Sequence, residues 1–410
     1  MSGEGAMPGL AVVVSQVPEP NETFIVREIG ELRRRGFAVT VFSLKPAPAA
    51  VPDPEARALQ PVTVYPPRAA ALVAEALRTC VRAPAAALRA IGRGLGDALR
   101  ALPSPILAAK QLAVLPLALA YAGRLPAGRL RLHAHFASVP TAAVRVMAAF
   151  RRQAYSFTAH AWDIYVGENT RQLAPRIAKA DLVVTCTAYN AAVLRQIAAA
   201  PADAAKVNLC HHGLDFALYE PGGERARDLI VGGASLVEKK GLHHLVGACA
   251  RLRDAGRRFR CVLIGEGPAR AELEAQIRAL DLEDRVQLLG RLSHRELVRW
   301  MREATVLAHP SIRDRHGSMD GIPNTVLEAM AVETPVVGTR LSGIPEVVIP
   351  EETGLLVEPG DEAALAAALA RLLDDPALGR RLGSAGRALV REGFDIERNV
   401  ARLAGLLARG

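Results

Sequence analysis

The feature that most limits how this chain can fold is an alternation of short apolar runs with segments of helical periodicity. The first apolar run is Leu10–Ser15. Ile25, Ile29 and Leu32 follow at helical spacing, and the next apolar run is Ala38–Leu44. Strand, helix and strand at this spacing predict a parallel sheet with helices packed on it. We therefore expect an α/β fold.

The same alternation continues along the rest of the sequence. Further strands are predicted at Val62–Tyr65, Arg131–Phe136, Ala154–His160, Leu182–Cys186, Val207–Cys210, Leu229–Val231, Cys261–Ile264, Val286–Leu289, Thr305–Ala308, Val336–Val337 and Leu355–Val357. The length of 410 residues is enough for two domains. Pro221-Gly222-Gly223 is the predicted linker. We predict a first domain over residues 1–222, a second over 223–390, and a last helix within 391–410.

Composition excludes several classes of protein. Five scattered cysteines form no paired Cys-x-x-Cys motif, which argues against a zinc site or a disulfide framework and favours a reducing cytoplasm. The first residues lack a basic stretch followed by an apolar core, so no signal peptide is expected. The Gly-x-Gly-x-x-Gly fingerprint is absent after the first apolar run, which disfavours a nicotinamide-dependent oxidoreductase.

The stretch richest in chemistry runs from Asp320 to Ala331 and reads DGIPNTVLEAMA. Pro323 suits the first position of a helix, because its missing N–H would have no partner there. Asp320 then lies on the preceding loop, and Glu328 lies about 7 Å further along the helix axis. A helix N-terminus favours phosphate through free N–H groups and a positive dipole. The pattern therefore fits a ligand with hydroxyls at both ends and phosphate near the middle.

This stretch resembles the acidic-x7-acidic motif of retaining glycosyltransferase family 4. The resemblance continues upstream through Leu236–Gly241 and downstream through Val336–Glu346, and it covers nearly the whole chain. A weaker similarity at Glu22-Thr23-Phe24-Ile25 points to family members that build bacterial exopolysaccharides of the colanic-acid type.

The resemblance implies a GT-B fold, in which two Rossmann-like, doubly wound domains face one another across a cleft. The second domain would hold a UDP- or GDP-sugar, and the first would hold a glycan or a polyprenyl-diphosphate-linked acceptor. The implied reaction is transfer of a hexose with retention at the anomeric carbon, in bacterial exopolysaccharide or lipopolysaccharide assembly. Neither a cofactor nor a metal is expected.

The resemblance also implies roles for individual residues. His160, Lys240 and Asp320 would be catalytic: His160 contacts the donor sugar, Lys240 neutralises the diphosphate, and Asp320 holds the sugar hydroxyls. Glu328 would hold the ribose hydroxyls of the donor. Asp320 is one methylene shorter than the usual glutamate of the family.

Other implied contacts flank these residues. The remaining donor-binding positions are Gly321, Ile322, Pro323, Asn324, Ser235, Gly265 and Leu292. Ser235 lies in the region where many relatives carry an arginine, so the diphosphate would meet one positive charge fewer; Arg313, Arg315 or His316 could compensate. The implied acceptor-side residues are Glu22, Thr23, His135 and Asp163. We expect His133 and His135 to point to opposite sides of their strand, and hence to form no metal pair.

Two other classes of function remain open from the sequence. One is a different GT-B enzyme acting on a nucleotide sugar, such as an epimerase or a phosphorylase. The other is a non-catalytic scaffold that binds a glycan or a lipid carrier. In the second case Asp320 and Glu328 would be a loop acid and a solvated helix acid, and Lys240 a surface lysine.

The positive charge of the chain is concentrated in one segment. Of the net charge of +9, the segment from Arg68 to Arg131 carries +8, from ten basic residues against Glu75 and Asp97. Its longest apolar stretch, Leu112–Ala122, is too short to span a bilayer. Basic amphipathic helices are expected, forming either a solvated outer face or a docking surface for the anionic inner leaflet. We therefore expect a cytoplasmic protein, which in the second case is peripheral on the inner face of the plasma membrane.

Overall fold

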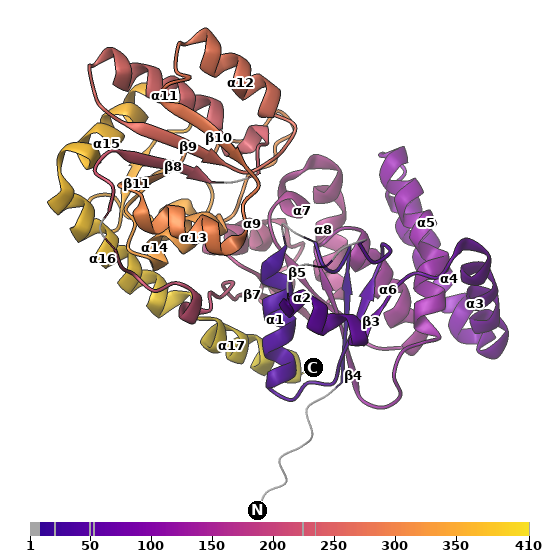
Figure 1. Cartoon of the computed structure of the whole chain (residues 1–410). Helices are drawn as coiled ribbons and strands as arrows, with labels where there is room; N and C mark the ends of the chain where they lie inside the picture. Colours follow the sequence, from indigo (N-terminus) through magenta and orange to yellow (C-terminus); the bar gives the residue numbers. More distant parts are fainter. Residues whose placement is uncertain are drawn as a thin grey trace, which may run out of the picture. The chain divides into compact units, whose positions relative to one another are not determined.

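The computed structural model describes residues 9–19, 22–48, 51, 54–223, 225–233 and 235–409, excepting the side chains of residues 167–169. The chain forms two compact units, which are described separately (Figure 1). The first unit comprises Met1–Gly213 and Ile396–Gly410, and the second comprises Leu214–Asp395.

The first unit is built on a seven-stranded parallel sheet of order β3-β2-β1-β4-β5-β6-β7. Its strands are β1 (Gly9–Val14), β2 (Val39–Ser43), β3 (Thr63–Val64), β4 (Leu130–His135), β5 (Ser156–Ala159), β6 (Leu182–Thr185) and β7 (Val207–Leu209). Its helices are α1 (Thr23–Arg34), α2 (Pro54–Leu59), α3 (Ala69–Arg82), α4 (Pro84–Arg100), α5 (Pro105–Ala122), α6 (Val139–Arg151), α7 (Trp162–Tyr165), α8 (Gly167–Lys179), α9 (Ala188–Ile197), α10 (Pro201–Ala204) and α17 (Ile396–Ala408).

Strand β1 shows why this sheet is covered on both faces. Successive side chains of a strand point to opposite sides. Leu10, Val12 and Val14 belong to one buried cluster, whereas Ala11 and Val13 belong to another. A strand that is buried on both sides must be apolar throughout, which is the pattern that predicted it.

The C-terminal helix α17 is part of the first unit and lies beside α1 (Figure 1). Ile396, Val400, Leu403 and Leu407 are buried in the same cluster as Leu10. Their spacing of three or four residues places them on one stripe of the helix. The chain therefore returns to the first unit after completing the second.

The second unit contains a six-stranded parallel sheet of order β10-β9-β8-β11-β12-β13. Its strands are β8 (Leu229–Gly233), β9 (Arg260–Ile264), β10 (Val286–Gly290), β11 (Val306–His309), β12 (Val336–Thr339) and β13 (Leu355–Val357). Its helices are α11 (Leu242–Asp254), α12 (Arg270–Ala279), α13 (His294–Glu303), α14 (Asn324–Ala331), α15 (Glu362–Asp374) and α16 (Pro376–Gly393). Both sheets confirm the predicted doubly wound α/β architecture.

The strand order identifies where each sheet can bind a ligand. In the first sheet the order reverses between β1 and β4, and in the second it reverses between β8 and β11. Ligands of open α/β sheets bind beyond the carboxyl ends of the strands at such a reversal. The loops that follow β8 and β11 carry Lys240 and Asp320.

The boundary between the units differs from the predicted one. It lies after Gly213, upstream of the Gly/Pro-rich turn at Pro221-Gly222-Gly223. Leu214 and Tyr219 lie before that turn and are buried in a core cluster of the second unit. The turn residues therefore mark a surface bend inside the second unit, and composition alone placed the linker wrongly.

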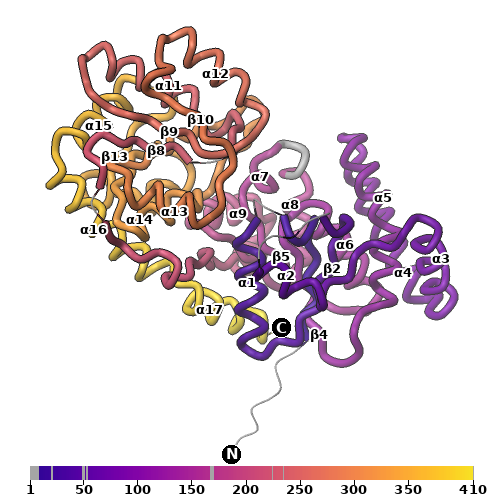
Figure 2. The backbone as a smooth tube through the Cα atoms, in the orientation of Figure 1, coloured from indigo at the N-terminus to yellow at the C-terminus, as the bar shows by residue number. Residues whose placement is uncertain are grey.

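The basic segment forms the helices α3, α4 and α5, which contact one another. Figure 2 shows the backbone passing through them in turn. Helix α5 is longer than the apolar run that predicted it. Its length of 18 residues and its mean hydropathy of 1.5 would allow it to cross a membrane. However, 56% of it is buried within the fold. Its contacts with α3, α4 and α6 are those of a core helix of the first unit.

Candidate functional site

Two lysines and one aspartate meet at the strand-order reversal of the second sheet. The Nζ atom of Lys239 lies 2.9 Å from Oδ1 of Asp320, and that of Lys240 lies 2.6 Å from Oδ2. The three side chains are mostly buried, with 23%, 15% and 13% of their surface exposed. The two cations therefore share one carboxylate in a partly desolvated site.

Tight packing between two loops fixes the lysines. They lie on a 3-10 turn, η3 (Glu238–Lys240), which ends at Gly241 with φ +63°. A Cβ atom at Gly241 would overlap the carbonyl oxygen of Pro310, so no other residue fits there. The backbone N–H of Ile312 donates to the carbonyl oxygen of Lys239 at 2.9 Å. The loops after β8 and β11 thus fix each other's position.

His309 is the last residue of β11 and lies next to this cluster. Its Nε2 lies 3.9 Å from Oδ2 of Asp320, and Thr325 Oγ1 lies 3.3 Å from its Nδ1. Burial lowers the pKa of His309, so the imidazole is neutral. Burial alone would raise the pKa of Asp320, but Lys240, His309 and Lys239 outweigh it and hold that pKa well below its usual range. Asp320 is therefore an anion at neutral pH.

Helix α14 begins immediately after the Asp320 loop. Pro323 is its N-cap residue, so the helix starts at Asn324, one position later than predicted. Gly321 and Pro323 are buried, and Ile322 and Asn324 are half-buried. The first N–H groups of a helix have no partner within it and attract an anion. The structure thus places a helix N-terminus four residues after Asp320, the partner of both lysines.

Glu328 lies on α14 and is buried, but it is not solitary. Its Oε1 accepts a hydrogen bond from the Tyr219 hydroxyl at 3.0 Å and lies 3.3 Å from Nε2 of His294. Tyr219 and His294 are themselves 2.9 Å apart. His294 is the first residue of α13, which Ser293 caps together with Glu296. A carboxylate held this firmly presents fixed acceptor oxygens.

The other predicted donor-side residues follow the carboxyl ends of neighbouring strands. Gly265 follows β9 and donates from its N–H to the carbonyl oxygen of Gly290 at 2.9 Å. Ser235 follows β8, and Leu292 follows β10 and packs on a core cluster of this unit. All three lie at the same edge of the sheet as Lys240, because the strands are parallel.

The two arginines that could compensate for Ser235 contact other side chains of the protein. Arg315 is exposed and pairs with Glu238 at 3.6 Å. Arg313 is also exposed, and its NH2 group contacts the sulfur of Met319 at 3.8 Å. Lys239, which also pairs with Asp320, is a better source of the second positive charge.

In the first unit, the carboxyl ends of four adjacent strands carry a row of polar side chains. His135 ends β4, His160 follows β5, Cys186 follows β6, and His212 lies three residues after β7. His135 Nδ1 lies 3.2 Å from His160 Nε2, and His160 Nδ1 lies 3.2 Å from His212 Nε2. At the other end of the row, Glu28 Oε1 lies 3.3 Å from His135 Nε2. We call Glu28, His135, His160 and His212 the histidine row.

The histidine row is uncharged at its centre. Burial lowers the pKa of His160 well below the usual value, and His212 and His135 lower it further. Burial also lowers the pKa of His212, to about 4. Each neutral imidazole has one donor and one acceptor nitrogen, so the hydrogen bonds along the row all run in the same direction. Phe24, at the start of α1, packs on His160 and His212 with ring centroids 5.1 and 4.2 Å away.

One prediction about the first unit changes in the structure. His133 and His135 share one face of β4, with ring centroids 5.3 Å apart, because residues two apart on a strand point the same way. The expectation that they point apart is wrong. They nevertheless have different partners: the nitrogens of His133 contact Ser156 and Thr158 at 2.8 and 3.0 Å.

Asp163 supports the row from below. Its carboxylate is fully buried and accepts from the backbone N–H groups of Ala137, His160 and Ala161 at 2.7, 3.1 and 2.9 Å. These bonds tie the end of β5 to the loop after β4. The structure therefore gives Asp163 a positioning contact to His160, and the predicted acceptor contact remains a proposal.

One group in the row has ligand types that suit a metal ion. Ligand atoms of His160, Cys186 and His212 lie within 4.8 Å of one another. Imidazole and thiolate are zinc ligands, and a catalytic zinc uses three protein ligands. However, both nitrogens of His160 already face other imidazoles, as a hydrogen-bonded row requires.

We predict that this group holds no resident metal. The full-length protein, purified without chelator or affinity metal, should contain substoichiometric zinc by elemental analysis. Chelator should leave its melting temperature unchanged. One zinc ion per chain that is lost in Cys186→Ser would contradict this prediction.

Glu22 is the N-cap residue of α1, which begins at Thr23. However, the side chain of Glu22 accepts no hydrogen bond from the N–H groups at the start of the helix. Its Oε2 is buried without a hydrogen-bond partner among the described residues. Burial raises the pKa of Glu22 to about 7, assisted by the charges of Glu19 and Asp163 and opposed by Lys45. A buried carboxyl group with this pKa holds a proton near neutral pH.

The raised pKa of Glu22 predicts a pH-dependent stability. An acid whose pKa is higher in the folded state costs stability as pH rises from its unfolded value to about 7. The free energy of unfolding of Glu22→Gln should therefore improve relative to wild type between pH 5 and pH 8. Denaturant titrations at several pH values measure this difference. A difference that does not change with pH would contradict the burial of Glu22.

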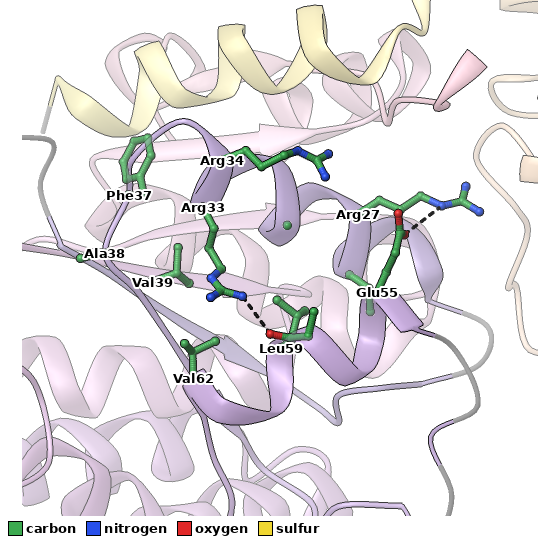
Figure 3. Close-up of a pocket in the computed structure, with 12 residues that line it drawn as sticks. Arg27, Arg33, Arg34, Phe37, Ala38, Val39, Glu55, Leu59 and Val62 are labelled. Carbon is green, nitrogen blue, oxygen red and sulfur yellow. Dashed lines mark hydrogen bonds and ion pairs between the residues drawn. The ribbon is translucent and has the colours of Figure 1, made fainter. Parts of the chain in front are cut away.

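A separate pocket of about 600 Å³ lies elsewhere in the first unit, between α1 and α2 (Figure 3). Three arginines line it, and each is already engaged. Arg27 pairs with Glu55 at 3.9 Å, Arg33 donates to the carbonyl oxygen of Ala58 at 2.9 Å, and Arg34 pairs with Glu31. None of the predicted site residues lines it.

The second unit matches a known protein family. Residues 225–389 match the family described as "Glycosyl transferases group 1". The amylovoran biosynthesis glycosyltransferase AmsK of Erwinia amylovora is 40% identical over 176 residues, which is 43% of either chain. The putative colanic acid biosynthesis glycosyltransferase WcaL of Escherichia coli K12 is 38% identical over 40% of this chain and 41% of its own. The chain thus spans about two fifths of the length of these curated relatives.

Solved structures match over almost the whole chain. Anabaena Alr3699/HepE, in complex with UDP and glucose, has a TM-score of 0.70 at 18% identity, covering 98% of this chain and 99% of its own. The fold is GT-B. Sucrose-phosphate synthase from Thermosynechococcus elongatus shares this GT-B fold with a TM-score of 0.70, 21% identity and 98% coverage of both chains. The resemblance to bacterial exopolysaccharide glycosyltransferases is confirmed at the level of family likeness and GT-B fold.

Several residues of this GT-B site were not predicted. They are Lys239, which pairs with Asp320, and Tyr219 and His294, which contact Glu328. A signal did exist for His212: it stands in Cys210-His211-His212-Gly213 directly after a strand, which is the position that identified His160. No sequence signal links Tyr219 to Glu328, because they lie 109 residues apart.

Proposed function

We propose that the chain is a retaining glycosyltransferase that moves a hexose from a nucleotide-diphosphate sugar to a glycan or lipid-linked sugar acceptor. The observation that carries this proposal is the cluster of Lys239, Lys240 and Asp320 at the strand-order reversal of the second sheet, next to the start of α14. Two lysines and a helix N-terminus suit a diphosphate, and Glu328 provides a fixed acceptor for ribose hydroxyls.

The ligand chemistry of solved relatives supports the same assignment. Anabaena HepE was crystallised with UDP, with UDP and glucose, and with UDP-glucose. AmsK and WcaL are named for the biosynthesis of amylovoran and colanic acid. We therefore assign this chain a nucleotide-sugar donor and a role in exopolysaccharide assembly.

Lys240 would serve Asp320 and the diphosphate at the same time. A lysine ammonium has three N–H donors, so one can remain on Asp320 while the others reach phosphate oxygens. Asp320 keeps spare acceptor sites for the hydroxyls of the donor sugar. The ion pair thus orients Lys240 before the donor arrives, which lowers the reorganisation needed during reaction.

The proposed reaction proceeds on one face of the sugar. The bond between the anomeric carbon and the leaving phosphate oxygen breaks, and the acceptor oxygen bonds to the same face. The departing diphosphate takes the acceptor proton. Charge builds on the diphosphate during this step, so the lysines and the helix N-terminus stabilise it when it matters most.

His160 would contact the donor sugar as a neutral imidazole. Its lowered pKa excludes the imidazolium form at neutral pH, and His135 and His212 fix the ring on both sides. A sugar hydroxyl would replace His135 or His212 at one ring nitrogen, to which it can donate or from which it can accept, and the neutral ring cannot act there as a cation. We assign it to sugar positioning.

The experiment that tests this function uses a panel of UDP-, GDP- and ADP-sugars with and without a polyprenyl-diphosphate-linked glycan extract. We expect one donor to release its nucleoside diphosphate faster when acceptor is present. Proton NMR of the product should show that the anomeric configuration of the donor is kept. Inversion would overturn the retaining assignment, and failure of every donor to react or bind would overturn the function itself.

A further inference from the structure

The first unit exposes an unusual amount of apolar surface over a short part of the chain. Among the described residues, twelve large apolar or aromatic side chains are exposed, and nine of them lie between Val73 and Leu112. Val81 is 80% exposed and Leu88 is 71% exposed. Scattered exposed apolar residues are normal, but a concentrated patch marks an interaction surface.

The exposed apolar residues form stripes on two amphipathic helices. On α3, Val73, Leu77 and Val81 recur every four residues and are exposed. On α4, Leu88, Leu95 and Leu99 recur at spacings of seven and four residues. Leu102 and Ile106 continue the exposed set at the turn into α5. Such spacing places each set on one side of its helix.

Buried contacts prevent these helices from turning their outer faces inward. Arg145 of α6 donates to both carboxylate oxygens of Asp97 on α4, at 2.7 Å each, and both side chains are buried. A Cβ atom at Gly94 would lie 2.7 Å from Leu115, which shows how closely α4 packs on α5. The apolar stripes are therefore fixed on the outside.

The charges on this surface have one sign. Arg78, Arg82, Arg100 and Lys110 are exposed on α3, α4 and α5. The only acidic residues within these three helices are Glu75 and Asp97. Glu75 pairs with Arg124, and Asp97 pairs with Arg145. We call the exposed side chains from Arg68 to Leu112 the α3–α5 face.

We propose that the α3–α5 face docks on the surface of an anionic phospholipid bilayer. The leucine and valine side chains would enter the boundary between head groups and acyl chains, and the arginines would contact lipid phosphates. This combination of an apolar face with flanking cations is typical of helices that lie in the interface plane. A merely solvated face would have no reason to expose nine large apolar residues.

The contacts of α5 indicate that it supports this surface without crossing the bilayer. Buried residues of α5, among them Leu117 and Tyr121, are part of the core of the first unit. Withdrawing it would leave the inner sides of α3 and α4 without their partner. The docking we propose is therefore peripheral and reversible, and it does not depend on which sugar the enzyme transfers.

Vesicle co-sedimentation of the full chain tests this proposal. We would compare phosphatidylglycerol-rich with phosphatidylcholine vesicles at low and high salt. Wild type should pellet with the anionic vesicles, and less so at high salt. Changing Arg78, Arg82 and Lys110 together to Gln should lower the partition coefficient on the order of 100-fold. Changing Leu77, Val81 and Leu88 together to Ser should remove the binding that persists at high salt.

A matched control comes from the second unit. Arg251, Arg258 and Arg278 are also exposed, and changing them to Gln removes the same charge from elsewhere. This control should bind as wild type does, and all variants should keep the wild-type circular dichroism. Equal, salt-independent recovery on both vesicle types would overturn the proposal. So would unchanged binding of the charge variant, or self-association that the Leu/Val→Ser variant abolishes without any vesicle binding.

Discussion

Lys240→Ala is expected to lower kcat by about 100- to 1,000-fold while weakening donor binding much less. The side chain ends 2.6 Å from Asp320, on the loop that leads to the start of α14. In the proposed reaction the leaving diphosphate gains charge at this place. An interaction that strengthens in the transition state affects turnover more than ground-state binding. Steady-state kinetics with the preferred donor separate kcat from KM.

Two companion variants make this result specific. Lys240→Arg keeps the charge and should recover part of the lost rate, although a guanidinium is bulkier than an ammonium. Lys239→Ala should have a smaller effect on kcat, and it leaves Asp320 paired with Lys240. If kcat of Lys240→Ala equals that of wild type, the leaving-group role belongs to Lys239 or Arg313.

Glu328→Ala is expected to weaken binding of the nucleoside diphosphate by about 2–3 kcal/mol, or roughly 30- to 150-fold in Kd. The reason is loss of charge-assisted hydrogen bonds from the ribose hydroxyls to a carboxylate that the fold already holds in place. Isothermal titration calorimetry measures the change directly.

The buried partners of Glu328 require a control for stability. Tyr219 is fully buried and donates to Glu328, so truncation to alanine leaves its hydroxyl without that acceptor. Glu328→Gln keeps an acceptor oxygen for Tyr219 but removes the charge. It should melt closer to wild type than the alanine variant and still bind more weakly than wild type. Wild-type affinity in Glu328→Ala would show that the ribose lies elsewhere.

The sheets could be predicted from the sequence because their strands are buried on both faces. A strand such as β1 must be apolar at every position, and that leaves a continuous run in the sequence. The domain boundary could not be predicted in the same way. Pro221-Gly222-Gly223 has the composition of a linker, but Tyr219 just before it is a core residue of the second unit.

Residues of the candidate site could be predicted where they lie within sequence motifs. Asp320, Glu328 and Lys240 follow from motifs and their position after strands. Contacts made across the fold were not predictable, such as those of Tyr219 and His294 with Glu328, because no local pattern encodes them. The contact of Lys239 with Asp320 depends on side-chain directions in the turn η3, which has no simple periodicity.

Hydrogen–deuterium exchange of the full chain, with and without the preferred nucleoside diphosphate, tests the central claim most directly. We expect added protection in the backbone N–H groups of Ser235–Gly241, on the lysine loop, and of Gly321–Val326, at the start of α14. At a nucleotide concentration that half-saturates the wild type, protection should be much weaker in Glu328→Ala, which is expected to bind the nucleotide poorly. Protection confined to the α1–α2 pocket, or none at either loop under saturating nucleotide, would contradict the account.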